Sequence, residues 1–226
     1  MKRPISVNTS KNFRLMEVAS PKDLSEANLA EPVIFKLPMD LVNIDDFQNY
    51  LSFLNLAKLD EIKNEIEKIR YIKTRGLINM LFSLENSEAE PIWKLNEYGK
   101  PYINGWDKDF SISHSREFSV VGVASEAIGV DIEDDGRDID LEKFKKTKFL
   151  NFDEGAYESK EEFLMRFIAL EAYLKYIGKG FHKDAGKIIV RKVNDAIVID
   201  DGSLIKAEVI KNGGYTISIV MNKKRR

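Results

Sequence analysis

The sequence predicts an α+β protein made of two successive halves, residues 1–117 and 118–226. Apolar residues first recur every three or four positions and then alternate, and this change from helical to strand spacing occurs twice along the chain. No stretch rich in proline or serine separates the halves. The length of 226 residues is sufficient for a substantial core.

Composition narrows the class of protein. The 35 Lys and Arg residues nearly balance the 37 Asp and Glu residues, which excludes a basic nucleic-acid coat. Because cysteine is absent, disulfides, thiolate zinc sites and a cysteine nucleophile are excluded as well. We find no signal peptide and no run close to the roughly 20 apolar residues of a membrane span, so we expect a soluble cytoplasmic protein. The basic tail at 223–226 is interpreted as a solvated end and not as a nucleic-acid site.

The first half begins with irregular chain and continues with helices. Residues 1–32 contain three prolines and predict extended or irregular structure with one strand near residues 13–18. From Asp40 to Leu54, and again from Leu56 to Leu84, apolar residues follow a helical period, so we expect two helices. The glycines and the proline of residues 96–106 then predict a loop that leads to a short strand.

Strands follow at the junction of the two halves. The segments FSISHS (110–115), FSVVGVA (118–124) and IGVDIE (128–133) have strand composition. Because only Ser125, Glu126 and Ala127 separate the last two, we expect these two strands to form a hairpin.

The remainder of the second half predicts one helix and a group of strands. Residues 162–177 are apolar on nearly every helical face, and Gly178 provides a stop signal. From Lys187 onward the sequence alternates, with turn signals at 201–202 and 212–214, which predicts three or four strands.

Two carboxylates stand two positions apart on the predicted strand 128–133. Asp131 and Glu133 therefore leave the same face, roughly 6.6 Å apart along the chain. At an effective dielectric constant of about 20, their repulsion amounts to about 2.5 kcal/mol. Such a pair either faces water on an amphipathic strand or, if it is half-buried, binds a hard cation such as Mg²⁺.

Glu171 lies on the apolar helix with little polar company except Arg166 and Lys175. A carboxylate in that setting is costly unless it is paired or bound to a metal. Lys175, one turn later, offers an ordinary ion pair at the i,i+4 spacing. The sequence supports the ion pair and the functional site equally.

The two histidines carry less information. His114, flanked by Ser113 and Ser115, either caps a turn, sits in the core or donates to a phosphate, and on its own the structural roles are favoured. His182 has no evident partner, and we expect it at the surface.

Four motifs in this order resemble a known family. They are NEYGKP at 96–101, FSISHS at 110–115, GVDIE at 129–133 and FIALEAYLKYIGKGF at 167–181, with a weaker similarity in YIKTRGL at 71–77. Their order and approximate spacing, and the chain length, resemble those of the larger, Sfp-type 4'-phosphopantetheinyl transferases.

The resemblance implies a fold of two similar α+β halves that form an intramolecular pseudo-dimer, with the metal site in the second half. It implies transfer of 4'-phosphopantetheine from coenzyme A to a serine of an apo acyl or peptidyl carrier protein, with release of adenosine 3',5'-bisphosphate. Mg²⁺, with Mn²⁺ as a substitute, is the implied cofactor, and the implied setting is fatty acid, polyketide or nonribosomal peptide synthesis. A monomer without nucleic-acid or membrane partners is expected.

The resemblance also implies roles for individual residues. Asp131, Glu133 and Glu171 would hold the metal, and Glu171 would be the base for the carrier serine, with Glu133 as the competing candidate. Lys175 would contact phosphate oxygens and stabilise the leaving group.

Further residues match the family's coenzyme contacts. They are Ser113 and His114 for the phosphates, Lys100 and Pro101 beside the adenine, and Arg75 as an additional phosphate contact.

Two positions of the helix motif depart from the family pattern of Trp-x-x-Lys-Glu. Phe167 stands in place of the tryptophan and keeps an aromatic ring, whereas Leu170 replaces the lysine before Glu171. The second change is interpreted as the loss of a cation near an anionic coenzyme. It raises the alternative of a non-catalytic relative that binds a carrier protein or coenzyme A.

Overall fold

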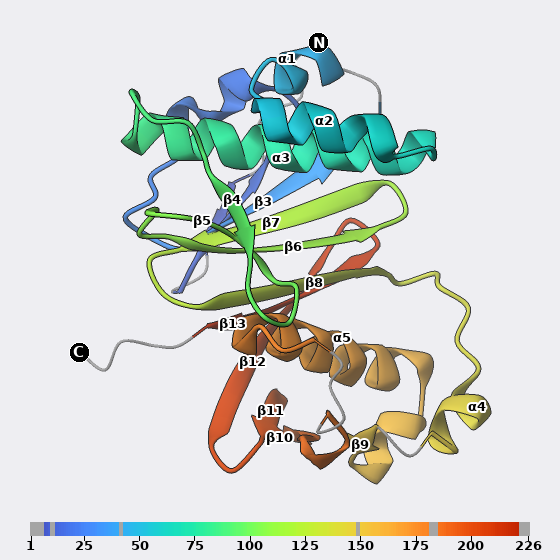
Figure 1. The fold of residues 1–226 in the computed structure, drawn as a ribbon. Coiled ribbons are helices and arrows are strands. Elements are labelled where there is room, and N and C mark those ends of the chain that lie inside the picture. Colours follow the sequence, from blue (N-terminus) through green and yellow to red (C-terminus); the bar gives the residue numbers. More distant parts are fainter. Residues whose placement is uncertain (1–6, 10–11, 41–42, 148–149, 181–184, 222–226) are drawn as a thin grey trace. The chain divides into compact units, whose positions relative to one another are not determined.

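The computed structural model describes residues 7–9, 12–40, 43–147, 150–180 and 185–221 (Figure 1). The chain divides into two compact units: unit 1 comprises residues 1–94 and 101–125, and unit 2 comprises residues 95–100 and 126–226. Each unit contains helices and a separate main sheet, so the predicted α+β class is confirmed.

The sheet of unit 1 has β3 near its centre. The strand order is β1 (Val7–Thr9), β2 (Arg14–Glu17), β3 (Val33–Pro38), β7 (Phe118–Ala124) and β6 (Asp109–Ser115). β2 is parallel to β3, whereas the pairs β3–β7 and β7–β6 are antiparallel. β2 confirms the strand expected near residues 13–18, and the 3₁₀ helix Pro21–Glu26 follows it.

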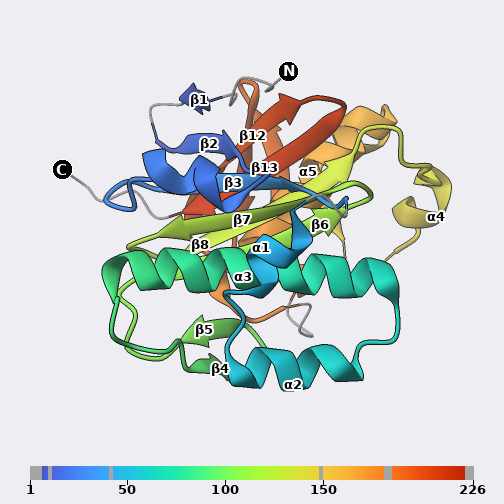
Figure 2. The ribbon, with the colours of Figure 1, turned by 90° about the horizontal axis from the view of Figure 1, so that it is seen from above.

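The helical segment of unit 1 is more divided than the sequence predicts. In place of two helices, the described chain forms α1 (Ile44–Gln48), α2 (Phe53–Glu61) and α3 (Glu65–Glu85). Caps explain the divisions: the Ser52 hydroxyl accepts from the Asn55 amide at 3.3 Å, and the Asn64 side chain accepts from the Ile66 amide at 2.9 Å. α2 lies alongside α3 (Figure 2).

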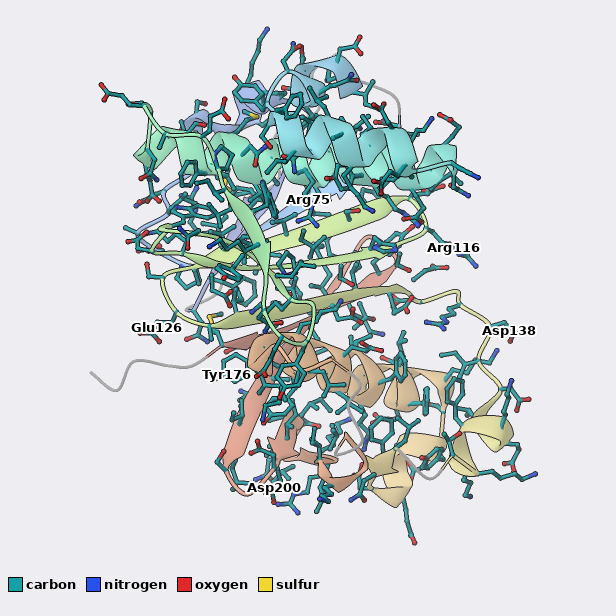
Figure 3. All side chains as sticks on the ribbon, viewed as in Figure 1. Arg75, Arg116, Glu126, Asp138, Tyr176 and Asp200 are labelled. Atoms are coloured by element: carbon teal, nitrogen blue, oxygen red, sulfur yellow. The ribbon has the colours of Figure 1, made fainter. Side chains whose placement is uncertain are left out.

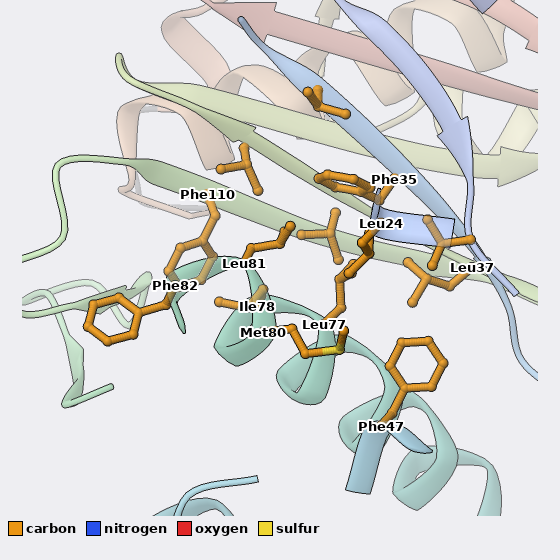
Figure 4. Close-up of a cluster of buried hydrophobic side chains, with 14 of the residues drawn as sticks. Leu24, Phe35, Leu37, Phe47, Leu77, Ile78, Met80, Leu81, Phe82 and Phe110 are labelled. Atoms are coloured by element: carbon orange, nitrogen blue, oxygen red, sulfur yellow. The ribbon is translucent and has the colours of Figure 1, made fainter. Parts of the chain in front are cut away.

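Apolar packing of α3 forms the core of unit 1. Its buried side chains share one cluster with the inward residues of β3, β6 and β7, and Figure 4 shows part of this cluster: Phe35, Leu37, Leu77, Ile78, Leu81 and Phe110. Gly76 allows α1 to approach α3, because a Cβ atom there would lie 2.3 Å from the Phe47 carbonyl oxygen.

A short hairpin, β4 (Trp93–Leu95) and β5 (Pro101–Ile103), follows α3. Its tip, residues 95–100, groups with unit 2 although the flanking chain belongs to unit 1.

The sheet of unit 2 packs against the long helix α5 (Lys160–Ile177) (Figure 1). Its strand order is β8 (Ile128–Asp134), β13 (Tyr215–Met221), β12 (Leu204–Asn212), β11 (Ala196–Asp200), β10 (Ile189–Val193) and β9 (Asn151–Phe152). The short helix α4 (Leu141–Lys145) and the 3₁₀ helices Glu154–Tyr157 and Ala185–Lys187 complete the described elements. The strands predicted after Lys187 are confirmed.

The two units share a topology. In each, a leading strand pairs antiparallel with the unit's last strand, which pairs in turn with the strand before it: β3–β7–β6 in unit 1 and β8–β13–β12 in unit 2. The longest helix, α3 or α5, lies in sequence between the leading strand and that later pair. β3 and β8 therefore hold corresponding places in this order, although β3 lies between β2 and β7 whereas β8 is the edge strand of its sheet.

The predicted hairpin between 118–124 and 128–133 is wrong. Both edges of β7 are used within unit 1, by β3 and β6, and β8 pairs with β13. The chain accordingly leaves unit 1 after Ser125, later than the expected division between residues 117 and 118, because β7 belongs to the sheet of unit 1.

Candidate active site

The candidate site begins where α5 crosses β8 in unit 2. Strand alternation places Gly129, Asp131 and Glu133 on one face of β8. A Cβ atom on Gly129 would lie 1.9 Å from the Ala172 carbonyl oxygen and 2.4 Å from the amide nitrogen of Tyr176, a residue of α5 labelled in Figure 3. Glycine thus allows the helix backbone to lie directly on the strand and brings the carboxylates of β8 beside α5.

Asp131 is buried beneath this helix. Its Oδ1 atom accepts from the Lys175 amine at 2.7 Å, and only 5% of the residue is exposed. The structure therefore contradicts a water-facing Asp131, one of the two alternatives that the sequence leaves open. It also pairs Lys175 with Asp131, and not with Glu171 as the ordinary helical ion pair requires.

Opposite Asp131 in the strand register lies Ser218 of β13. Its buried hydroxyl oxygen has no hydrogen-bond partner among the described residues. A buried hydroxyl group normally has a hydrogen-bond partner. An unpartnered hydroxyl beside a carboxylate is therefore unusual for a purely structural contact between strands.

Glu133 and Glu171 complete the group of carboxylates. Glu133 forms an ion pair with Arg137, whereas no ion pair joins Glu171 to another residue in the described part of the chain. Burial raises the pKa of Glu171 to about 7, and the charge of Asp131 adds to this effect. Glu133 raises this pKa further, while Lys175 and Arg137 oppose the change.

The donor set suits a hard cation. Carboxylate oxygens are the ligands that Mg²⁺ prefers, and the mutual repulsion felt by Glu171 is what a cation would relieve. Within the described ranges, however, no three His, Cys, Asp or Glu side chains are gathered closely enough to form a ready metal site. Lys175 and Arg137 instead neutralise Asp131 and Glu133.

The structure corrects the interpretation of Leu170. The sequence interpretation treats it as a lost cation beside the coenzyme, but Leu170 is completely buried in the core of unit 2, among residues such as Ile168 and Leu174. Neighbouring residues on a helix point about 100° apart, so Glu171 faces the carboxylates while Leu170 faces the core. The Leu170 side chain itself therefore does not face the carboxylates.

Phe167 retains an aromatic role. Its ring stacks on Phe163 with a centroid distance of 5.8 Å, and the Arg137 guanidinium lies 5.9 Å from the ring centroid of Phe167. Phe167 thus contacts the cation that pairs with Glu133.

The two residues matched to adenine contacts, Lys100 and Pro101, have different surroundings. The Lys100 amine donates to the Ile128 carbonyl oxygen at 3.2 Å, at the start of β8. Pro101 begins β5 and is partly buried.

The motif residues matched to phosphate contacts lie in unit 1. Ser113 and His114 are consecutive on β6, so Ser113 is buried and His114 is exposed. His182 and the basic tail at 223–226 fall outside the described residues.

Arg75 on α3 is an unusual cation in unit 1 (Figure 3). Its guanidinium lies 4.1 Å from the Trp93 ring centroid and 5.5 Å from that of Tyr71, and its enclosed Nη1 atom has no hydrogen-bond partner in the described structure. Burial lowers the pKa of Arg75. Such a desolvated guanidinium suits an anion.

Sequence reasoning did not single out Gly129, Arg137 or Trp93. Gly129 was detectable, because a glycine two positions before Asp131 on the same strand face indicates a close backbone approach. Arg137 and Trp93 carried no local signal, since their partners are set by a turn and by tertiary packing.

Among the helices that the structure describes, none has the length and apolar composition that crossing a membrane requires.

No family model matches the chain. Two curated proteins are similar to the chain. The chain is 33% identical over 95 residues to the 4'-phosphopantetheinyl transferase gsp of Aneurinibacillus migulanus, which covers 40% of each protein. It is 32% identical over 116 residues to the 4'-phosphopantetheinyl transferase of Bacillus subtilis, which covers 48% of this chain and 52% of that relative.

The chain therefore spans about half the length, or less, of the curated relatives it matches. These similarities confirm the resemblance found in the four motifs: over about half its length, the chain is a homologue of the Sfp-type 4'-phosphopantetheinyl transferases.

Proposed function

We propose that this protein transfers the 4'-phosphopantetheine group of coenzyme A to a serine of an apo acyl or peptidyl carrier protein. The observation that carries the proposal is the seam between α5 and β8, where Asp131, Glu133 and Glu171 lie with Lys175 on two adjoining elements. The similarity to named transferases supports the same reaction.

In this proposal Asp131, Glu133 and Glu171 hold Mg²⁺, with Mn²⁺ as a substitute. When bound there, the metal would offset the charge of the coenzyme's pyrophosphate. Asp131 is suited to the role because its burial and its contact with Lys175 fix its orientation.

Glu171 is proposed as the base. The oxygen of the carrier serine forms a bond to the reacting phosphorus, the bond from that phosphorus to the bridging pyrophosphate oxygen breaks, and the serine proton passes to Glu171. A carboxylate whose pKa is raised to about 7 is a stronger base than an ordinary glutamate. Glu133 is the weaker candidate, because its ion pair with Arg137 engages its charge.

Lys175 is proposed to stabilise the leaving group, adenosine 3',5'-bisphosphate, which departs with the bridging oxygen and an added negative charge. Its amine already lies 2.7 Å from Asp131 and is partly exposed. We assign the coenzyme phosphates to Arg75, Ser113 and His114, and the adenine to the Lys100–Pro101 segment.

The shared topology of the two units supports a proposal about assembly. Because β3–β7–β6 and β8–β13–β12 repeat one arrangement, we propose an intramolecular pseudo-dimer that is monomeric in solution. From the similarity to named transferases we also propose that it acts in the cytoplasm. Sedimentation of the purified chain as a dimer would contradict the monomer.

The reaction is tested by incubating apo carrier proteins with coenzyme A, Mg²⁺ and the purified protein. We expect a mass increase of the carrier that corresponds to one phosphopantetheine group, and no increase with Asp131→Ala. The matched control is Asp138→Ala, because Asp138 is fully exposed and pairs only with Lys160 in the described structure. Wild-type transfer by Asp131→Ala would contradict the proposed site.

The alternative, a non-catalytic relative that binds coenzyme A or a carrier protein, is the second candidate function. It depended on Leu170 as a missing cation, and that side chain lies in the core. Binding of coenzyme A without transfer to any of several apo carrier proteins would favour it again.

A further inference from the structure

The tip of the β4–β5 hairpin is a turn held together by one side chain. The backbone amide of Asn96 donates to the backbone carbonyl oxygen of Lys100 at 2.9 Å. The side-chain oxygen of Asn96 accepts from the backbone amides of Tyr98 and Lys100, each at 2.9 Å. The oxygen end of the Asn96 side chain is thus used within the turn, and the nitrogen end is directed elsewhere.

That nitrogen end donates to the last turn of α5. Asn96 Nδ2 lies 2.9 Å from the carbonyl oxygen of Gly178, the residue in left-handed conformation (φ 66°) that ends the helix. Carbonyl groups at a helix end have no partner within the helix, so this bond satisfies one of them. The fit is close, because a Cβ atom on Gly178 would lie 3.0 Å from Asn96 Nδ2 and 3.2 Å from Lys100 Cδ.

The same turn also holds the start of β8, where the Lys100 amine donates to the Ile128 carbonyl oxygen at 3.2 Å. One small segment of chain is therefore bonded both to the end of α5 and to the beginning of β8. Lys175 lies one turn before Gly178, and Asp131 lies three residues after Ile128.

We propose that Asn96 is a positioning residue: it anchors the C-terminal turn of α5 against β8 and thereby fixes the contact between Lys175 and Asp131. Gly129 sets the closeness of the helix to the start of β8, and Asn96 fixes the end of the helix beside it. The consequence for catalysis rests on the function proposed above, whereas the anchoring itself does not.

The sharpest variant is Asn96→Asp. A carboxylate retains the oxygens that accept from Tyr98 and Lys100, so the turn persists, but it has no N–H group to donate to Gly178. Asn96→Ala removes both interactions. The matched control is Asn86→Ala, because the Asn86 side chain donates to the Phe82 carbonyl oxygen at 3.1 Å at the end of α3 in unit 1.

The first measurement is the rate of Lys175 acetylation in the full chain, followed by peptide mass mapping. An amine paired with a buried carboxylate is shielded, so both Asn96 variants should label Lys175 about fivefold faster than wild type, the equivalent of one net hydrogen bond. Asn86→Ala should label Lys175 at the wild-type rate. Equal Lys175 labelling in wild type and Asn96→Asp would overturn the proposal.

The second measurement is Mn²⁺ binding, followed by the paramagnetic resonance of free Mn²⁺. Both Asn96 variants should bind Mn²⁺ about tenfold more weakly, as is typical when a residue that supports metal ligands is lost. If Lys175 labelling responds while wild type binds no Mn²⁺, the anchoring role stands and the proposed metal site fails. If Mn²⁺ affinity falls as much in Asn86→Ala as in Asn96→Asp, the effect is general and the positioning role is refuted.

Discussion

Units 1 and 2 place opposite chemistry at the seams along two corresponding strands, β3 and β8. In unit 1, β3 presents Phe35 and Leu37 to the apolar core that includes α3. In unit 2, β8 presents Asp131 and Glu133 on the face where α5 lies, and α5 contributes Glu171. The pairs β3–β7–β6 and β8–β13–β12 follow the same order, but β3 is also flanked by β2 whereas β8 is an edge strand, so the two seams differ in their surroundings as well as in their side chains.

This comparison separates what the fold needs from what a function needs. In unit 1 apolar side chains fill the space between the sheet and α3, and their burial stabilises the unit. The carboxylates of unit 2 repel one another, and the raised pKa of Glu171 records that repulsion together with burial. Charged groups that a fold does not need, held in one place, indicate a functional site.

The largest expected effect is on activity. Glu171→Gln removes the proposed base and one proposed metal ligand together while keeping the size of the side chain. We expect kcat for phosphopantetheine transfer to fall on the order of 10³-fold. The measurement is the rate of carrier-protein modification at saturating coenzyme A.

The control for that variant lies on the same helix. Glu161→Gln changes an exposed glutamate that pairs with Lys211, and it should leave the rate unchanged. A Glu171→Gln protein with more than a tenth of the wild-type kcat would remove Glu171 from the proposed role.

The next largest effect concerns the core of unit 2. Leu170→Lys places an ammonium group in a site that is completely buried, and we expect a loss of about 3–5 kcal/mol in the free energy of unfolding. Leu170→Met should lose less than about 1.5 kcal/mol, because it conserves volume. Urea denaturation of both variants measures the contrast. A Leu170→Lys protein as stable as wild type would show that this position does not face the core.

Leu170 also marks the limit of what the sequence predicts. Spacing of two along β8 correctly placed Asp131 and Glu133 on one face, because strand alternation is a local property. On α5 nearly every face is apolar, so periodicity could not say which side chain faces the core. The motif match located Glu171, but it carried no information about the direction of its neighbour.

The pairing between strands that are distant in sequence could not be predicted from the sequence either. A connection of three residues between 118–124 and 128–133 is typical of a hairpin, yet the partners of these strands lie far away in sequence, at 33–38 and 215–221. The division between α2 and α3 was different, since Asn64 is a capping residue visible in the sequence. The ion pair of Arg137 depended on a turn that no local pattern specified.

A pair of glycines tests whether helix approach matters equally in both units. Gly76→Ala and Gly129→Ala each place a Cβ atom against backbone, 2.3 Å from the Phe47 carbonyl oxygen and 1.9 Å from the Ala172 carbonyl oxygen. Both should lower the free energy of unfolding by about 1–3 kcal/mol, the usual cost of overpacking. Of the two, Gly129→Ala should also weaken Mn²⁺ binding, because it displaces α5 from Asp131. Equal Mn²⁺ affinities in both variants would contradict that link.

The smallest expected effect is a pH dependence of stability that belongs to the carboxylate seam. The folded pKa of Glu171 is about 7, against 4.5 for an ordinary glutamate, so between these pH values the folded protein binds this proton more tightly than the unfolded chain. Stability contributed by this proton is therefore fully present below pH 4.5 and is lost as pH rises through 7. After allowance for partial exposure, the loss is on the order of 1–2 kcal/mol. Glu171→Gln cannot titrate, so in metal-free buffer the free energy of unfolding of wild type minus that of the variant should fall from pH 5 to pH 8. Taking this difference cancels the carboxylates with lowered pKa values, such as Asp153 and Glu162, which titrate in both proteins. A difference that stays constant, or rises with pH, would show that Glu171 is not destabilised by burial and by its neighbours, and the contrast between the two seams would then lose its electrostatic basis.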